Sequence, residues 1–565
     1  MRISEYSFDR MGREVLRTDV HGTDWPVLYM ISNDKEAYIG ETCNMYNRML
    51  QHLQNGSRSS LRRLDVISHE RFNKSAVLDL EQMLIRHCGA DGRFRLQNIS
   101  SGQSASHRYY QREMYMRMLP DIWQELLRRG LAEHELEDVR NSNLFKYSPY
   151  TSLTFEQMTV CSDILSDLLE KLVTGTHGTA VIHGSAGTGK TVLAINMMFT
   201  LSNLGSDEQQ FDTGYEMESG NTIVVEKLSN YVKEHGTLKI GFVVPMTSLR
   251  RTLEIVFRDS GNGLTREMVI GPSQVVGGDY DVLIVDESHR LSRRRNISYM
   301  GSFDNTCRKL DLNPVESTQL DWILRSSRYT VLFYDGNQTV KGSDITTDQF
   351  DNIIGDGRID FRLHSQLRCL SGDEYPMYLD RIFRCVQPHR EEFGEYDLRI
   401  FDDVGDMVES VKRLDSELGL CRNVAGYAWE WRSKGMSRDE VIATHSEDIV
   451  IGEHRFIWNM ENVEWILREG SVDEIGCIHT TQGYDLNYVG VIIGPEVDYD
   501  EVSDKIVVYP DRFHDKYVKQ GADYDTLKRY IINSYRVMMT RGIRGCYVYA
   551  CNPSMARYLR RYIDS

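Results

Sequence analysis

The chain has 565 residues, of which 41% are hydrophobic and 26% are charged, a composition typical of a globular protein with three to four domains. We find no apolar run of about 18 residues that would predict a transmembrane helix, and no signal peptide is expected. The net charge of −17 excludes a surface coated in positive charge, although it permits a local basic groove. The ten cysteines form no C-x-x-C pair, so the sequence favours a reducing, cytoplasmic location.

The first predicted elements are a β-hairpin and two helices. Apolar runs predict strands over residues 25–31 and 37–40, joined by a polar turn. Apolar residues spaced three and four apart predict helices over residues 44–53 and 75–88. Two tyrosines on the hairpin therefore face an arginine and a histidine on the first helix, and a glutamate lies beside the buried stripe of the second. With a later asparagine, the set is Tyr29, Tyr38, Arg48, His52, Glu81 and Asn98.

This set resembles the GIY-YIG nuclease domain over about residues 24–100. Val27-Leu28-Tyr29 and Tyr38-Ile39-Gly40 stand for the two family triplets, with Val27 in place of the first glycine. The resemblance implies a metal-dependent endonuclease in which a tyrosine helps to activate water and Arg48 stabilises phosphate charge. Glu81 would hold one magnesium or manganese ion, while His52 and Asn98 orient the water and support the site. A non-cleaving copy that only binds nucleic acid is the alternative.

Basic residues are dense around this domain and suggest a phosphate-tracking surface, although a solvated face is the common alternative. The basic residues are Arg58, Arg62, Arg63, Arg71, Lys74, Arg93, Arg95, Arg108 and Arg112. Residues 111–140 are predicted to be helical and to connect this domain to the next one. Gln157 then resembles the adenine-reading glutamine of helicases, and a simple helix cap at Thr154 is an equal alternative.

A P-loop follows, because Gly184-Ser-Ala-Gly-Thr-Gly189-Lys190-Thr191 fits G-x-x-x-x-G-K-[ST] at every fixed position. A strand-like run precedes it and a helix-like run follows it, which is the context that the motif requires. Lys190 would reach the β- and γ-phosphates of ATP, and Thr191 would offer its hydroxyl to magnesium. The residues predicted to bind ATP here are Gln157, Gly184, Ser185, Ala186, Gly187, Thr188, Gly189, Lys190 and Thr191.

Two later strands each end in polar residues, at the edge where active groups of open α/β sheets lie. The run 281–285 precedes Asp286 and Glu287, which are predicted to hold magnesium through water and to position the attacking water. The run 330–334 precedes Gln338, which resembles the glutamine that senses the γ-phosphate between motor lobes.

The last motifs lie in a second predicted lobe. Arg368 is a candidate arginine finger, and Thr480-Thr-Gln-Gly-Tyr-Asp485 resembles the superfamily 1 motif whose first residues contact nucleic acid and whose acid bonds the ribose. Arg541 would reach the γ-phosphate from this lobe. In this order the motifs resemble those of the Schlafen-type, helicase-like P-loop ATPases of superfamily 1, which implies two RecA-like lobes with ATP between them.

Together the patterns predict an α/β protein. Its parts are a small α+β GIY-YIG domain over 1–105, a helical connector over 106–150, and RecA-like lobes over 151–350 and 351–565. The two resemblances imply an ATP-dependent nuclease–helicase that uses ATP and Mg²⁺, acts on nucleic acid, DNA rather than RNA, and binds no membrane. By analogy it would act in anti-phage defence. The alternatives are a nucleic-acid-dependent ATPase with a binding-only first domain, and a regulatory ATP switch; the oligomeric state is open.

Overall fold

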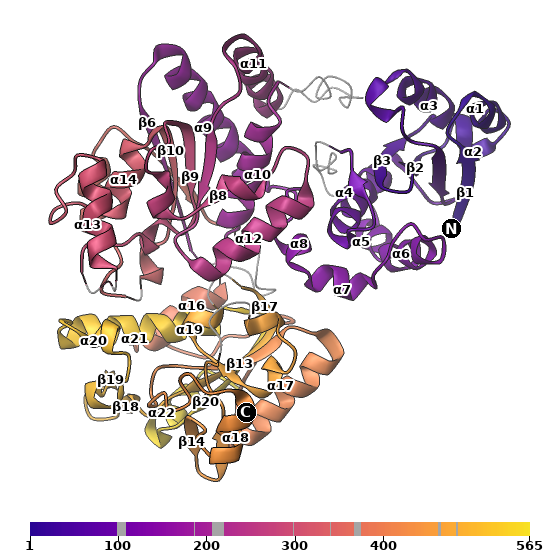
Figure 1. Ribbon diagram of the computed structural model, residues 1–565. Coiled ribbons are helices and arrows are strands. Elements are labelled where there is room, and N and C mark those ends of the chain that lie inside the picture. The colour runs from indigo at the N-terminus through magenta and orange to yellow at the C-terminus, as the bar shows by residue number, and fades with distance from the viewer. Residues whose placement is uncertain are drawn as a thin grey trace. The chain divides into compact units, whose positions relative to one another are not determined.

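Three β-sheets of five or six strands organise the part of the chain that the computed structural model describes (Figure 1). The described residues are 1–98, 109–185, 187–205, 220–295, 297, 299–339, 341–365, 374–460, 465–481 and 484–564. The chain divides into two compact units, Met1–Glu170 with Thr191–Ile240 and Leu253–Val269, and Lys171–Lys190 with Gly241–Thr252 and Ile270–Ser565. No helix among the described residues has the length and apolarity needed to cross a membrane.

The first sheet has the strand order β1-β4-β2-β3-β5 and contains the predicted hairpin. Its strands are β1 (Arg2–Ser7), β2 (Val27–Ser32), β3 (Glu36–Thr42), β4 (Arg63–Ser68) and β5 (Arg95–Leu96). β2 and β3 pair in antiparallel register with Tyr29 opposite Gly40. β2 lies between β3 and β4 in the sheet and is buried along its whole length. β5 runs parallel to β3 and forms one edge of the sheet.

Four helices accompany this sheet: α1 (Arg10–Leu16), α2 (Val20–Thr23), α3 (Met45–Gln54) and α4 (Lys74–Asp91). The predicted helices over 44–53 and 75–88 are confirmed as α3 and α4. Each begins after an asparagine, Asn44 or Asn73, whose side-chain oxygen accepts a backbone N–H of the first turn. α4 packs against β3, and Gly92 with φ of 81° ends it.

The connector is helical, as predicted, but it is divided into short helices. These are α5 (Arg112–Met116), α6 (Leu119–Arg128), α7 (Leu136–Asn141) and α8 (Asn143–Lys146). Pro120 lies in the first turn of α6, where its missing N–H is tolerated, and Gly130 adopts φ of 68° just after α6. Pro120 and Gly130 thus mark the two ends of α6, although the apolar spacing alone suggested one long helix.

The second sheet has six strands in the order β11-β6-β10-β9-β7-β8. They are β6 (Gly178–Gly184), β7 (Ile240–Val243), β8 (Val269–Ile270), β9 (Tyr280–Val285), β10 (Ser327–Tyr334) and β11 (Ile359–Leu363). β10 pairs in parallel with both β6 and β9, so it separates the strand before the P-loop from the strand before Asp286. β11 pairs with β6, whereas the sequence placed this strand in the second lobe. A short apolar run does not reveal its non-local partner.

Helices alternate with these strands, as in other parallel sheets. They are α9 (Phe155–Thr174), α10 (Lys190–Ser202), α11 (Gly220–His235), α12 (Thr247–Ser260), α13 (Met300–Lys309), α14 (Gln319–Arg325) and α15 (Thr347–Ile354). The short 3-10 turns η5 (Ser288–Arg290) and η6 (Gly336–Gln338) follow β9 and β10 and carry polar residues.

The third sheet is parallel and has the order β12-β20-β17-β13-β16. Its strands are β12 (Asp397–Ile400), β13 (Cys421–Ala425), β16 (Ile475–Gly476), β17 (Leu486–Ile493) and β20 (Gly542–Ala550). Two small hairpins, β14 (Ile449–Ile451) with β15 (His454–Phe456) and β18 (Val497–Asp500) with β19 (Lys505–Val508), lie between them in sequence.

The helices of this lobe are α16 (Glu374–Phe383), α17 (Val404–Leu418), α18 (Arg438–Thr444), α19 (Ile478–Thr481), α20 (Lys516–Lys519), α21 (Tyr524–Met539) and α22 (Pro553–Leu559). The chain is thus an α/β protein in which a small mixed sheet is followed in the sequence by two RecA-like parallel sheets.

Candidate functional site

The hairpin and α3 bring together a buried cluster of two tyrosines and a histidine. The Tyr29 hydroxyl lies 2.8 Å from His52 Nε2 and accepts a 3.1 Å hydrogen bond from Arg48 Nε. The Tyr38 ring packs 5.0 Å from the His52 ring, centroid to centroid. Tyr29, Tyr38 and His52 are at most 2% exposed, so their polar atoms sit in a low-dielectric site. Four of the six predicted residues therefore meet in one place.

Gly40 makes room for this cluster. A Cβ atom at this position would lie 2.3 Å from the Tyr29 hydroxyl oxygen and 2.4 Å from Tyr29 Cζ. Tyr29 lies directly opposite Gly40 on the neighbouring strand, and its ring occupies the space that a side chain at position 40 would take. The glycine of the second triplet is thus explained by its contact with the tyrosine of the first.

Asn98 supports the hairpin backbone. Its side-chain oxygen accepts from the Ile39 N–H at 3.1 Å, and its amide nitrogen donates to the Ile39 carbonyl at 2.8 Å. Ile39 lies between Tyr38 and Gly40, so Asn98 holds the second triplet in place. Asn98 is 2% exposed, which makes these two hydrogen bonds costly to lose.

Arg58 is a residue of this cluster that the sequence analysis did not single out. Its guanidinium lies 3.6 Å from the centroid of the Tyr38 ring, and its Nη1 is 3.5 Å from His52 Nε2. In the sequence Arg58 looks like the other basic residues of this domain, several of which pair with acids of the same domain. Arg63 contacts Asp65, and Arg112 contacts Asp79, each at 2.6 Å. Arg108 lies outside the described residues.

Glu81 lies on α4, half-buried, and is the residue predicted to hold a metal. Within the described ranges, no group of three or more His, Cys, Asp or Glu side chains is arranged to hold a metal ion. A single carboxylate still fits magnesium, which keeps several water ligands and is commonly held by one or two carboxylates together with substrate phosphate oxygens. A role of Glu81 in holding a metal therefore stays a prediction.

The P-loop connects β6 to α10. Gly187 and Gly189 adopt φ of 88° and 76°, which favours glycine and turns backbone N–H groups inward. Gly184 is also constrained, since a Cβ there would lie 2.5 Å from Thr188 Oγ1. The Lys190 ammonium is buried and donates to the carbonyls of Gly184 and Ser185 at 2.7 and 2.9 Å. Thr191 lies in the first turn of α10, and Ala186 lies outside the described residues.

Asp286 and Glu287 directly follow β9 and are both buried, as their position in the sequence predicts. Glu287 has φ of 50°, and its Oε2 has no hydrogen-bond partner among the described residues. His289 Nε2 lies 3.2 Å from this oxygen, without hydrogen-bond geometry. Burial lowers the pKa of His289 to about 3, so the ring is neutral at pH 7. The sequence analysis did not single out His289.

A continuous polar path joins the P-loop lysine to the second lobe. Lys190 Nζ lies 3.8 Å from Asp335 Oδ2, which accepts a 2.7 Å hydrogen bond from Gln338 Nε2. Arg541 Nη2 in turn donates to Gln338 Oε1 at 3.4 Å. Arg541 is 2% exposed. The structure thus brings together Lys190, Gln338 and Arg541, and adds Asp335, an acid that follows β10 as Asp286 follows β9.

Asp485 is a neighbour of Arg541. The residues on either side of it contact Arg541: Arg541 Nη1 donates to the Tyr484 carbonyl at 3.5 Å, and the Leu486 N–H donates to the Arg541 carbonyl at 3.0 Å. The Tyr484 hydroxyl also lies 2.9 Å from Thr252 Oγ1 of α12. Gln482, Gly483 and the candidate finger Arg368 lie outside the described residues.

Gln157 takes part in a helix cap. Its Oε1 accepts from the Thr154 N–H at 3.0 Å, and Thr154 Oγ1 accepts from the Gln157 N–H at 3.2 Å. This is the reciprocal capping box, the simpler of the two alternatives. A role of Gln157 in reading adenine stays a prediction.

The residues of this region fit a nucleoside triphosphate and magnesium. Gly187 and Gly189 have the backbone angles of a phosphate cradle, and Glu287 offers a buried carboxylate oxygen that has no hydrogen-bond partner among the described residues. The sequence assigns magnesium to Thr191 and Asp286, whose hydroxyl and carboxylate are hard oxygen ligands that suit this ion, and this assignment stays a prediction.

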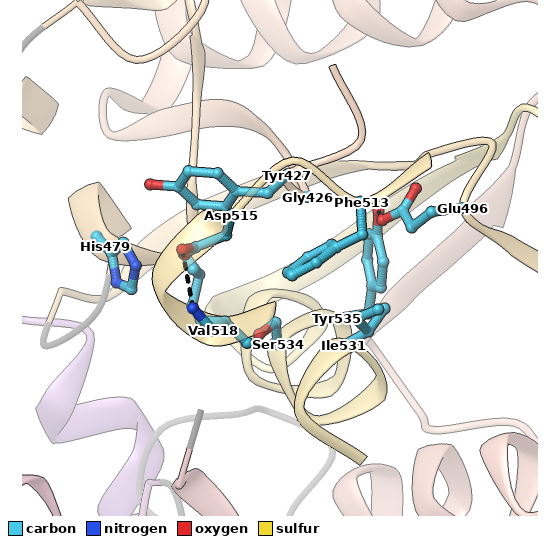
Figure 2. Close-up of a pocket in the computed structure, with 11 residues that line it drawn as sticks. Gly426, Tyr427, His479, Glu496, Phe513, Asp515, Val518, Ile531, Ser534 and Tyr535 are labelled. Atoms are coloured by element: carbon cyan, nitrogen blue, oxygen red, sulfur yellow. Dashed lines mark hydrogen bonds between the residues drawn. The ribbon is translucent and has the colours of Figure 1, made fainter. Parts of the chain in front are cut away.

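A separate small cavity of about 20 Å³ lies in the second lobe, and Figure 2 shows Glu496 and Tyr535 on one side of it and His479 on the other. The Tyr535 hydroxyl donates to Glu496 Oε1 at 2.6 Å, while Glu496 Oε2 has no hydrogen-bond partner in the described part of the chain. Burial raises the pKa of Glu496 to about 7 and holds the pKa of His479 well below its usual range. The volume suits one water molecule, so this cavity does not hold the nucleotide.

Comparison with known proteins connects the second and third sheets to one family. The model of the Schlafen group 3, DNA/RNA helicase domain matches residues 177–552. The uncharacterized protein YPL245W of Saccharomyces cerevisiae is 27% identical over 417 residues, which cover 67% of this chain and 83% of that protein.

Solved Pif1 helicases are distant neighbours. One is from Bacteroides in complex with ADP-AlF3 and ssDNA and the other from Candida albicans; both are 9% identical to this chain, with TM-scores of 0.23 and 0.24. The alignments cover 70% and 73% of this chain and 94% and 98% of those chains. Such scores are too low to carry an argument, which therefore depends on the family match and the site geometry.

Proposed function

The chain belongs to the Schlafen group 3 DNA/RNA helicase domain family, and from this premise we propose that it hydrolyses ATP to move on nucleic acid and cuts that nucleic acid with its first domain. Its fold is that of a helicase-like, nucleic-acid-dependent ATPase. The observation that carries the motor proposal is the polar path from Lys190 through Asp335 and Gln338 to Arg541, because it joins the P-loop to the lobe that must close on ATP.

In the proposed ATP hydrolysis, the P-loop lysine, the acid after β9 and the second-lobe arginine have separate tasks. Lys190 leaves the carbonyls of its own loop and neutralises charge on the β- and γ-phosphates. Glu287 accepts a hydrogen bond from the attacking water through its Oε2, which has no hydrogen-bond partner among the described residues and lies beside the neutral ring of His289. Arg541 stabilises the charge that develops on the γ-phosphate. Magnesium, when bound at Thr191 and Asp286, neutralises further phosphate charge.

In the proposed nuclease reaction, Tyr29 is the residue next to the attacking water. Its hydroxyl lies between His52 Nε2 and Arg48 Nε, so it can take a proton from water as its own proton passes to His52. Arg48 and Arg58 place two cations beside the phosphate charge. Glu81 would hold a magnesium or manganese ion, whose charge stabilises the leaving oxygen.

Strand cleavage and phosphate release, measured on the same preparations, test the proposal. We expect Glu81→Ala to abolish cutting of a labelled strand while ATPase stimulated by single strands stays near the wild-type rate. Glu70→Ala, an exposed glutamate of the same domain, is the matched control and should cut normally. Cutting that survives in Glu81→Ala would contradict the nuclease proposal. Loss of phosphate release in the folded Glu81→Ala protein would contradict the separation of the two activities.

The same assays separate the alternatives. A wild-type protein that binds nucleic acid without cutting it, with any divalent metal, would have a binding-only first domain. ATPase that does not respond to single-stranded DNA or RNA would favour a regulatory ATP switch over a translocating motor. Comparison of DNA with RNA decides between the two substrates, of which we propose DNA.

We propose a cytoplasmic setting for this activity and, by analogy with nuclease–helicase fusions, a role in anti-phage defence. Protection of phage-challenged bacteria by the wild-type protein, and its loss in Glu81→Ala and Lys190→Ala, tests that role. Equal protection by all three proteins would contradict it.

A further inference from the structure

The edge strand of the first sheet is covered by a residue that lies far along the chain. Among the described strands β5 pairs with β3 alone, so the carbonyls on its outer side have no strand partner in this part of the chain. Asn262, between α12 and β8, donates from its side-chain nitrogen to the carbonyls of Leu96 at 2.7 Å and Asn98 at 3.0 Å. Because both acceptors are carbonyls, the nitrogen of the Asn262 amide must be the atom that faces them.

The Tyr150 hydroxyl oxygen lies 2.7 Å from the same nitrogen, whose two N–H groups are thus shared among three oxygens, and that hydroxyl donates to the Asn98 carbonyl at 3.2 Å. Tyr150 is 2% exposed, and its ring lies against Gly89 of α4, where a Cβ would come within 2.9 Å of it. The Asn262 amide therefore enters a buried polar network of the first domain. A buried network of this kind is sensitive to the loss of one member.

The backbone around Asn262 adopts a left-handed conformation over three successive residues. Gly261, Asn262 and Gly263 have φ of 62°, 50° and 87°, and asparagine is among the few residues that tolerate this region. The Asn262 carbonyl accepts a 2.8 Å hydrogen bond from Asn203, just after α10. The loop is thus fixed on one side to the end of α10 while its amide reaches β5 on the other.

We propose that Asn262 is a positioning residue for the nuclease site, contributed by the ATPase part of the chain. By holding the outer edge of β5 it fixes Asn98, which in turn fixes Ile39 between Tyr38 and Gly40. This inference rests on the proposed nuclease function. The dependence runs in one direction: cutting needs Asn262, whereas ATP hydrolysis does not need the residues of the nuclease site.

Two substitutions distinguish the effect of the Asn262 amide hydrogen bonds from the effect of the loop conformation. Asn262→Gly keeps the left-handed backbone and removes the donor. Asn262→Asp keeps both the shape and the backbone preference, but places carboxylate oxygens against the oxygens of Leu96, Asn98 and Tyr150. Asp311→Gly is the matched control, because Asp311 is exposed and has φ of 56°. All variants are made in the full chain, and thermal melting verifies that each is folded.

Hydrogen exchange of the peptide that spans β3 is the direct measurement, since it needs no cleavage activity. We expect the amide of Ile39 to exchange about tenfold faster in Asn262→Gly, the effect of one lost buried hydrogen bond, and faster still in Asn262→Asp. The kcat of strand cleavage should fall in the same order, with KM and ATP hydrolysis little changed.

Unchanged exchange over residues 36–42 in both variants would overturn the inference, as would an equal effect of Asp311→Gly. If the wild-type protein does not cut nucleic acid, the proposed function fails, and the exchange measurement alone still decides whether Asn262 positions this strand.

Discussion

Replacement of Gly40 by alanine is the sharpest test of the first domain. The added Cβ would lie 2.3 Å from the Tyr29 hydroxyl oxygen and 2.4 Å from Cζ, whereas carbon atoms in contact are about 3.5–4.0 Å apart. The overlap of more than 1 Å falls on a rigid ring, so rotation of a flexible end group cannot relieve it. Tyr29 is fully buried and its ring packs against the rings of Tyr38 and His52, so it cannot shift without displacing these neighbours.

Overpacking of this kind costs about 1–3 kcal/mol of stability, which corresponds to a fall of roughly 5 °C or more in the melting temperature of a domain of this size. The effect on cutting should be larger. Displacement of a reacting group by about 1 Å reduces the rate by about 10², so Gly40→Ala should nearly abolish cleavage while ATPase is retained.

Calorimetry and a strand-cleavage assay measure the two effects. Gly56→Ala is the control in the same domain, because no described atom lies within 4 Å of a Cβ at Gly56. We expect this control to melt and cut like the wild-type protein. If Gly40→Ala also cuts at the wild-type rate, the Tyr29–Gly40 contact does not shape the site and the reasoning is refuted.

The remaining predictions concern the two lobes. Lys190→Ala should reduce phosphate release by about 10² or more, and wild-type turnover would contradict the P-loop assignment. Glu287→Gln should bind ATP but hydrolyse it poorly; lost nucleotide binding, measured by fluorescence, would mean that Glu287 is structural. Arg541→Ala should keep binding and lose about 10³ in kcat, and unchanged turnover would contradict its role. Burial raises the pKa of Glu496 from 4.5 to about 7, so between these pH values the unfolded chain loses a proton that the folded protein keeps. Stability should therefore fall by up to about 3 kcal/mol as pH rises from 4.5 to 7, and Glu496→Gln should lack this fall. Parallel melting curves of the two proteins against pH would contradict it.

Features with local causes were predictable from the sequence. The hairpin and α3 follow from apolar spacing, and α3 begins at Asn44, a residue type that favours this position. The fixed positions of the P-loop placed Lys190 at the start of the helix that follows β6, because the motif and its flanking elements are contiguous. Asp286 and Glu287 were placed for the same reason, directly after a buried strand.

Features with distant causes were not predictable. β11 joins the second sheet through pairing with β6, nearly 180 positions earlier. The pattern of residues 359–363 alone does not indicate which strand they pair with. Arg58 stacks on Tyr38 although it looked like one of many surface cations. Asn262 reaches Asn98 across 164 positions, and its sequence context, between two glycines, indicates only a turn.

One measurement tests the central claim that a motor and a nuclease work on the same substrate. The wild-type protein and Lys190→Ala are given a short labelled single strand and a long forked duplex, with magnesium and with or without ATP, and the products are resolved on a gel. We predict that both proteins cut the short strand without ATP, and that only the wild-type protein with ATP cuts within the duplex. Duplex cutting by Lys190→Ala at the wild-type rate would contradict the account, since the duplex would then be cut without ATP hydrolysis.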